Sequence, residues 1–311
     1  MKKILNEYFD KIALIIGNGI NRYGPENNNS SWESLLEELA LGYRLFPNKN
    51  NKLKFSELIK GLSLTEFYDI VDMKANQLNR STSFQQEFCS LMKDWPPKNH
   101  HFSIANWAQH NSSPILTTNF ENTLGKSTAC KLSKIDSIPG IARKNFTDYY
   151  PWSSYYGTGK LSNPIDGFGI WHMNGMEYYP RSIRLGLTHY MGSVERARAW
   201  FHKGKNSRLF SGKSMSTWKG SQTWLNIIFN KPLLIFGLAL EENEVFLRWL
   251  LLERARYFNK FPNQSKKAWY VYPSNEKLTN GKRMFLEGVG ITPYEVHDYD
   301  SIYSDQTWGR A

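Results

Sequence analysis

The first apolar run of the chain covers residues 12–16 and stops abruptly at a Gly-Asn-Gly turn. An unbroken apolar run of this kind predicts a buried strand, and the glycines predict a tight turn at its carboxyl end. Leucines then recur at helical spacing across residues 32–43, where Ser30 or Ser31 can cap the first turn. Strand, glycine turn and helix in this order are typical of the first βα unit of a dinucleotide-binding fold.

Further strand patterns follow along the chain, at residues 115–118, 169–172, 232–236, 268–272 and 291–296. Helical patterns lie between or beside them, at residues 100–110, 188–201, 224–229, 242–257 and 276–287. Such alternation predicts a mainly parallel sheet with helices on both faces. We therefore expect a Rossmann-like α/β fold that spans residues 1–311 as a single domain.

Three segments interrupt this alternation. Residues 46–98 combine Asn/Lys-rich connections with helical patterns at 67–78 and 84–95, so they predict a helical insertion within the domain. Residues 125–164 have no sustained period and predict irregular structure. The Gly/Ser-rich segment 203–220 carries several lysines and predicts a basic, flexible loop.

Charge and cysteine content limit the class of protein. The formal net charge of +11 favours contact with phosphates, whether of a nucleotide, a nucleic acid or an acidic partner. Cys89 and Cys130 are the only cysteines, which excludes a four-cysteine zinc site and fits a reducing cytoplasm. No apolar run approaches the roughly 18 residues of a membrane span. We expect a cytoplasmic protein that neither holds a metal nor crosses a membrane.

Candidate chemistry gathers at the predicted carboxyl ends of the strands. In parallel α/β sheets, ligands bind beyond these ends, near the point where the strand order reverses. Gly17, Asn119, His172 and Gly237 all fall at the ends of strand patterns. The turn that begins at Gly17 lacks the three-glycine dinucleotide fingerprint, because Arg22 occupies the third position. A turn that serves only tight packing is therefore an alternative to a phosphate-binding turn.

Four segments resemble the sirtuin (SIR2-like) family in their order and approximate spacing. They are IIGNGIN at 15–21, TTNFE at 117–121, WHMNG at 171–175 and LLIFGLAL at 233–240. The first resembles the family's glycine-bearing approach to NAD, and the second resembles its Asn-bearing loop. The third and fourth resemble its His-Gly segment and the glycine that ends a late strand.

The departures from the family narrow this resemblance. An Asn-rich loop at 23–31 replaces the proline-aspartate-phenylalanine-arginine stretch of the deacetylases, and the four zinc-binding cysteines are absent. Two residues separate His172 from Gly175, whereas the family usually has the histidine and the glycine next to each other. Glu121 stands where an aspartate is common in the family. The pattern looks like the SIR2-like domains of bacterial anti-phage defence, which resemble NAD glycohydrolases rather than deacylases.

The resemblance implies cleavage of NAD+ to nicotinamide and ADP-ribose, with NAD+ as the substrate and without a metal. Cleavage of the nicotinamide–ribose bond passes through an oxocarbenium-like ribose, which needs a positioned polar group and a base. We expect Asn119 to hold the ribose hydroxyls and an attacking water, and His172 to accept a proton with a pKa near neutrality. The expected NAD-binding residues are Gly17, Asn18, Gly19, Asn21, Arg22, Thr118, Glu121, Gly237, Ser274 and Asn275.

The chain has no recognisable sensor domain of its own, so the resemblance implies a separate activating protein. Such effectors work beside a nucleotide-sensing or nucleotide-processing protein, a helicase or an Argonaute-type protein, and some act as homo-oligomers. Triggered loss of NAD+ would be an antiviral, abortive-infection response. A second hypothesis is a non-catalytic module that senses NAD or ADP-ribose and regulates a partner. A third hypothesis is nucleic-acid binding through the basic residues. The NAD+ glycohydrolase hypothesis involves nucleic acid only indirectly.

Overall fold

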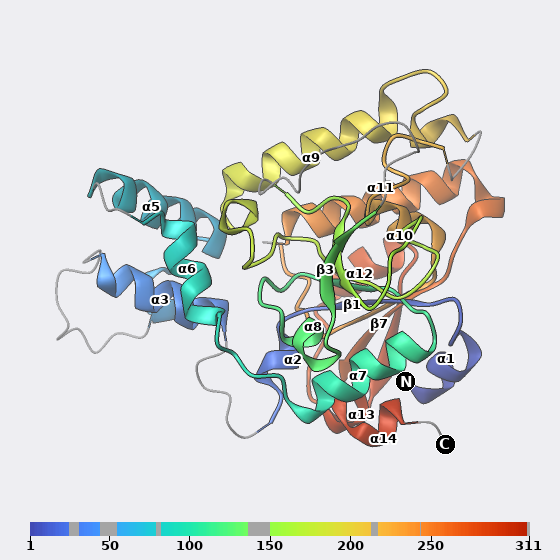
Figure 1. The fold of residues 1–311 in the computed structure, drawn as a ribbon, viewed down its shortest axis with the longest axis horizontal. Helices are drawn as coiled ribbons and strands as arrows, with labels where there is room; N and C mark the ends of the chain where they lie inside the picture. Colours follow the sequence, from blue (N-terminus) through green and yellow to red (C-terminus); the bar gives the residue numbers. More distant parts are fainter. Residues whose placement is uncertain are drawn as a thin grey trace.

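A computed structural model describes residues 1–24, 31–43, 55–78, 82–135, 150–212, 217–242 and 244–309. Its centre is an eight-stranded sheet in the order β3-β4-β5-β2-β1-β6-β7-β8 (Figure 1). The strands are β1 Ala13–Ile16, β2 Ile115–Thr117, β3 Lys131–Lys134, β4 Ser154–Gly157, β5 Ile170–His172, β6 Leu233–Phe236, β7 Ala268–Pro273 and β8 Thr292–Val296. The short apolar runs of the sequence thus form neighbouring strands of one sheet.

The sheet is mixed, and most of it is parallel. Strands β5, β2, β1, β6, β7 and β8 pair in parallel, whereas β3 and β4 add antiparallel pairs at one end. In the middle, Ile15 of β1 pairs with Leu116 on one side and with Ile235 on the other. The strand order therefore reverses at β1. The prediction of an α/β fold with a mainly parallel sheet is confirmed.

Helices precede, follow or connect most of the strands. They are α1 Lys2–Glu7, α2 Gly19–Arg22, α3 Trp32–Gly42, α4 Phe55–Leu58, α5 Leu64–Gln77, α6 Phe84–Met92, α7 Asn99–His110, α8 Thr123–Ser127, α9 Leu187–His202, α10 Leu225–Asn230, α11 Val245–Lys260, α12 Asn280–Gly288, α13 Asp300–Tyr303 and α14 Asp305–Trp308. Short 3-10 turns lie at η1 Pro180–Ser182, η2 Leu209–Ser211 and η3 Pro262–Gln264. In the described part of the chain, no helix has the length and apolar character needed to cross a membrane.

Both faces of the sheet are covered, because successive residues of a strand point to opposite sides. Ala13 and Ile15 of β1 belong to a core that includes residues of α9, α10, α11 and α12. Leu14 and Ile16 belong to a second core, which includes residues of α1, α7, α13 and α14. Every residue of β1 is buried as a result.

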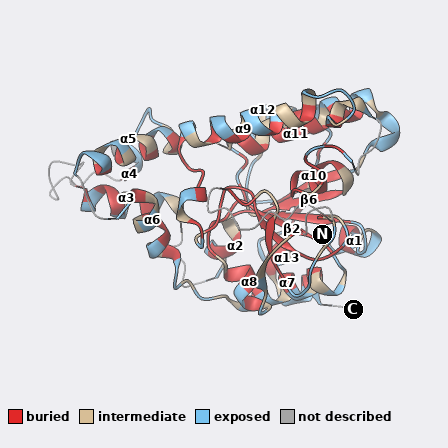
Figure 2. Cartoon of the chain, turned by 45° about the horizontal axis from the view of Figure 1, so that its top comes forward, coloured by how far each residue is buried: buried red, intermediate tan, exposed pale blue. Residues whose placement is uncertain are grey.

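The helices α3, α4, α5 and α6 form a third core to one side of the sheet (Figure 1, Figure 2). Ser63 and Ser83 begin α5 and α6 with capping boxes, which satisfy the first free backbone N–H groups of each helix. Phe120, which follows β2, packs against Trp32 of α3 and Phe88 of α6. The helical layer thus contacts the carboxyl edge of the sheet. It includes α3, which precedes the predicted insertion 46–98.

Two local predictions differ from the structure. The segment 125–164, predicted to be irregular, contains the end of α8 and the strands β3 and β4, while 136–149 lies outside the described residues. Each of these strands has four residues at the antiparallel end of the sheet, so neither needs a sustained apolar pattern. The helix predicted at 276–287 begins later, because the Thr279 hydroxyl caps it by accepting the N–H of Lys282 at 3.2 Å.

The segment 203–220, predicted to be a basic flexible loop, contains η2 and is anchored to the core by Leu209 and Trp218. Trp218 is 2% exposed, and its Nε1–H donates to Oδ1 of Asn226 in α10 at 3.1 Å. Residues 213–216 lie outside the described part of the chain. Trp218 thus ties this segment to the core that includes residues of α9, α10 and α11.

Candidate functional site

Four strand ends meet at one edge of the sheet. Ile16 pairs with Thr117 of β2 and with Phe236 of β6, and Thr117 in turn pairs with His172 of β5. The residues that follow these strands therefore lie side by side at the point where the strand order reverses. The predicted candidates at the ends of β1, β2, β5 and β6 are brought together in this way.

His172 is held by the backbone of Asn119. Its Nδ1 lies 2.8 Å from the Asn119 carbonyl oxygen, and because a carbonyl only accepts, Nδ1 carries the hydrogen. The other ring nitrogen, Nε2, is then an acceptor, and it is buried without a described partner. Burial lowers the pKa of His172 to about 4. The ring is neutral at pH 7, and the expected pKa near neutrality is corrected.

The Asn119 side chain is oriented by a carboxylate. Its Nδ2–H donates to Oε1 of Glu121 at 3.2 Å, which leaves Oδ1 buried without a described partner. The hydroxyl of Thr118 is likewise buried without a described partner. A buried polar atom without a partner costs about 1–3 kcal/mol, so water or a ligand at these adjacent strand ends would find several atoms able to form hydrogen bonds.

Glu121 also holds the first glycine turn. Its Oε1 accepts the Asn21 Nδ2–H at 2.8 Å and the Thr123 hydroxyl at 3.2 Å. Burial raises the pKa of the Glu121 carboxyl, and the hydrogen bonds that it accepts, with that from Asn21 the largest, oppose this rise. Asn21 in turn donates to Oδ1 of Asn18 at 2.7 Å. One oxygen of Glu121 thus fixes the amides that follow β1 and β2.

A pair of buried histidines supports this turn from α7. His101 Nδ1 accepts the backbone N–H of Lys98, so its Nε2–H is free to donate to Oδ1 of Asn21, 3.0 Å away. Burial lowers the pKa of His101 to about 3, which keeps the ring neutral. His100 Nε2 lies 2.7 Å from the Ile20 carbonyl oxygen. Sequence reasoning missed this role, because contacts across 80 residues leave no local signal.

The glycines of the two strand-end turns pack against each other. Gly19 N–H donates to the Gly237 carbonyl oxygen at 2.6 Å. A Cβ atom at Gly19 would lie 2.8 Å from the Gly237 backbone and from the hydroxyl of Tyr303, and one at Gly17 would lie 2.3 Å from the Cβ of Leu238. Close packing thus accounts for these glycines without a ligand. Tyr303, whose buried hydroxyl has no described partner, was not predicted.

The remaining predicted residues lie farther out. Arg22 is exposed and acts electrostatically on Tyr299 and Tyr303, near α13. Ser274 and Asn275 are exposed after β7, which β6 separates from β1. The Ser274 hydroxyl donates to the carbonyl of His297 rather than toward the centre of the site. The structure brings neither Ser274 nor Asn275 together with Asn119 and His172.

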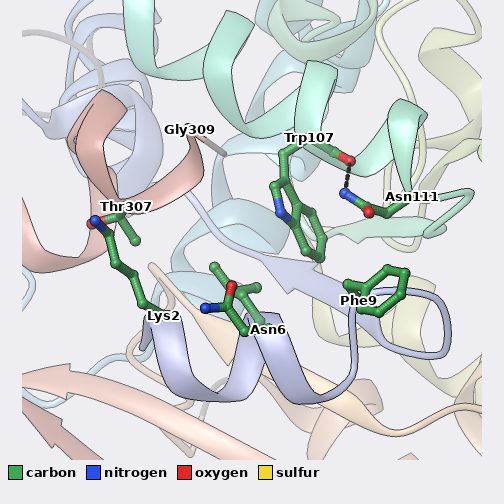
Figure 3. Close-up of a pocket in the computed structure, with 8 residues that line it drawn as sticks. Lys2, Asn6, Phe9, Trp107, Asn111, Thr307 and Gly309 are labelled. Atoms are coloured by element: carbon green, nitrogen blue, oxygen red, sulfur yellow. Dashed lines mark hydrogen bonds between the residues drawn. The ribbon is translucent and has the colours of Figure 1, made fainter. Parts of the chain in front are cut away.

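The central side chains are closed off from solvent. Asn119 and His172 are each 1% exposed. A cavity of about 320 Å³ lies elsewhere, between α1, α7 and the C-terminal residues, where Phe9 and Trp107 form its apolar wall (Figure 3). Among its described lining residues only Lys2 is charged. Its described lining includes neither a histidine nor a carboxylate.

No protein-family model matches the chain, and no curated protein matches it. The geometry of the strand-end site is therefore the basis for a function.

Proposed function

We propose that the protein is a SIR2-like NAD+ glycohydrolase with a Rossmann-like NAD site at the carboxyl edge of its sheet. The observation that carries the proposal is the pairing of His172 with Asn119. This pairing leaves Nε2 of His172 as a buried acceptor without a described partner. At the neighbouring strand end, the contact of Asn119 Nδ2 with Glu121 leaves Oδ1 of Asn119 in the same state. In this proposal residues 1–311 form a single domain, and 46–98 are a helical insertion within it.

In the proposed reaction, Oδ1 of Asn119 accepts a hydrogen bond from a ribose hydroxyl or from the attacking water. The bond between C1′ and the nicotinamide nitrogen breaks, and its electron pair leaves with nicotinamide. The water oxygen bonds to C1′, and its proton passes to Nε2 of His172. The products are nicotinamide and ADP-ribose. A weak base suffices, because the oxocarbenium-like ribose attracts the water strongly as the proton leaves.

A neutral His172 suits a cationic substrate. The pKa of about 4 keeps an imidazolium charge away from the positively charged nicotinamide ring near pH 7. The buried carboxyl of Glu121 acts through the amides of Asn21 and Asn119, and it is a positioning residue in this scheme.

Burial of both central residues supports control by a second event. A dinucleotide reaches Asn119 and His172 only after the surrounding segments move, since each is 1% exposed. We propose that a partner protein or an infection signal causes this movement, in a cytoplasmic antiviral response that ends in abortive infection. A sensor, a helicase, an Argonaute-type protein, a nucleotide-processing protein or a second copy of the chain would supply the trigger.

The test is release of nicotinamide from NAD+ by the purified chain together with the products of its neighbouring genes. Asn119→Ala and His172→Ala are expected to lose at least about 100-fold in rate. Asn106→Ala and His110→Ala are matched controls, because both residues are exposed on α7. Equal rates for all four variants would show that the proposed residues do not act in the reaction.

The same closed site favours one alternative, a non-catalytic module that binds NAD or ADP-ribose and regulates a partner. It predicts that NAD+ binds and stays intact through long incubation with the partner present. Cleavage of NAD+ that depends on His172 would exclude this alternative.

A further inference from the structure

A larger cavity, of about 700 Å³, lies between α6, α9 and the segment that follows β5. Its described lining includes Arg181, Arg184, Arg196 and His189. The facing acidic groups are Asp69 and Asp72 of α5, which interact electrostatically with His189. Positively charged groups outnumber carboxylates here among the described residues. Guanidinium groups bind phosphates in a bidentate manner.

Arg184 is held in place before any ligand arrives. It is 8% exposed, and its Nη1–H groups donate to the carbonyls of Arg181 and Ile183 at 3.1 and 3.2 Å. Its guanidinium also lies 5.1 Å from the centre of the Tyr150 ring. A preorganised arginine loses little freedom when it binds an anion.

The cavity has the size and lining of a nucleotide site. Its volume falls within the range of about 300–1,000 Å³ that is usual for small-molecule sites. The half-buried Trp152 adds an aromatic wall, and the hydroxyls of Thr188 and Ser193 add polar contacts. Charge, aromatic surface and hydroxyls together fit a nucleotide that carries a diphosphate.

The wall of this cavity is shared with the segment that carries His172. The Tyr150 hydroxyl donates to the carbonyl of Met173, and the backbone N–H of Arg184 donates to the carbonyl of Asn174 at 2.7 Å. Asn174 then donates through Nδ2 to the carbonyl of Thr118 at 3.3 Å. Two cavity residues thus contact the chain directly after His172.

We propose that this cavity is a regulatory site for a small ligand with a phosphate or diphosphate, of the nucleotide class. Its occupancy controls the position of the segment 172–174. Binding of the ligand to this cavity does not depend on whether the protein cleaves NAD+. Control of catalysis by that ligand rests on the proposed NAD+ glycohydrolase function.

Titration calorimetry of the full chain with ADP and with inorganic pyrophosphate tests the binding. Arg181→Gln and Arg196→Gln are expected to weaken ADP binding about tenfold each, as expected for loss of a charge-assisted hydrogen bond. Arg198→Gln is the matched control for Arg196→Gln, because Arg198 is also exposed on α9 and does not line the cavity. If pyrophosphate binds as tightly as ADP, the cavity recognises the phosphates alone. If pyrophosphate binds more weakly than ADP, the cavity also recognises the nucleoside.

Asn119→Ala separates this cavity from the NAD site. The inference predicts that Asn119→Ala binds ADP like the wild type and that ADP slows amide hydrogen exchange in residues 172–196. Loss of ADP binding in Asn119→Ala but not in Arg196→Gln would overturn it, as would the absence of binding by both probes. If ADP protects 172–196 but the chain leaves NAD+ intact even with its neighbouring gene products present, the proposed function is refuted and the binding site is retained.

Discussion

The Nδ1 atom of His172 lies 2.8 Å from the backbone carbonyl oxygen of Asn119. This contact joins the segment that follows β2 to the last residue of β5, and it sets which nitrogen of the imidazole can accept a proton. The chemistry proposed for the site follows from that choice, and so do its pH dependence and its sensitivity to neighbouring residues.

The first prediction concerns the acid side of the pH profile. The pKa of about 4 means that His172 in the free protein stays neutral as the pH falls from 7 to 5.5. kcat/KM, which reports ionisation of the free enzyme, is therefore expected to change little over this range. A base with the ordinary pKa of about 6.5 would instead lose roughly tenfold by pH 5.5. Such a loss, in protein whose fluorescence shows an intact fold, would contradict a buried neutral His172.

The second prediction concerns Glu121. Glu121→Ala removes the acceptor that orients Asn21 and Asn119, so kcat is expected to fall by up to about 100-fold. The free energy of unfolding is expected to fall by about 1–3 kcal/mol, because buried amides lose their partner. Glu121→Gln keeps an acceptor oxygen and is expected to retain most of the activity. Equal losses in both variants would show that the negative charge, rather than the orientation of the amides, matters.

The third prediction concerns stability and His101. Its pKa is about 3 in the folded chain and about 6.5 when unfolded, so the unfolded state binds more protons between these values. This histidine therefore makes the wild type less stable as the pH falls. In chemical denaturation, the wild type is expected to lose about 1 kcal/mol more than His101→Gln between pH 7 and 5.5.

A comparison with an exposed histidine completes this test. His110→Gln, on the same helix, controls for the removal of a histidine as such. Parallel stability curves for the wild type and His101→Gln would contradict a His101 that is buried in its neutral form.

The fourth prediction concerns the packed glycine turns. Gly237 has a φ of +71°, and a Cβ atom there would lie 2.5 Å from the Tyr303 hydroxyl. Gly237→Ala is expected to lower the free energy of unfolding by about 1–3 kcal/mol. Tyr303→Phe in the same chain removes the clashing oxygen and is expected to restore part of that loss. Gly281→Ala has open space at its Cβ within α12, so its melting temperature should not fall.

The alternation of apolar runs and helical patterns was enough to predict the sheet. Every strand predicted from an apolar run exists within a residue or two, because buried parallel strands need uninterrupted apolar residues. The sequence does not predict strands β3 and β4, since most of their side chains are polar or aromatic and the strands lie at one end of the sheet. The position of a residue after a strand likewise predicted that Asn119 and His172 would meet.

The sequence alone does not predict which side chains contact one another at the strand ends. His101, Tyr303 and Arg184 come from α7, α13 and the segment after η1, and only the tertiary fold brings them to the strand ends. The predicted pKa of His172 near neutrality is wrong for the same reason. Its value depends on burial, which a residue at a strand end does not reveal by itself.

The most direct test of the proposed function is cleavage of NAD+ in ¹⁸O-labelled water by the chain and its neighbouring gene products. The proposal predicts equal amounts of nicotinamide and of ADP-ribose with one ¹⁸O at C1′, and their loss in His172→Ala. NAD+ that stays intact in the wild type, or products that still form at the same rate in His172→Ala, would contradict it.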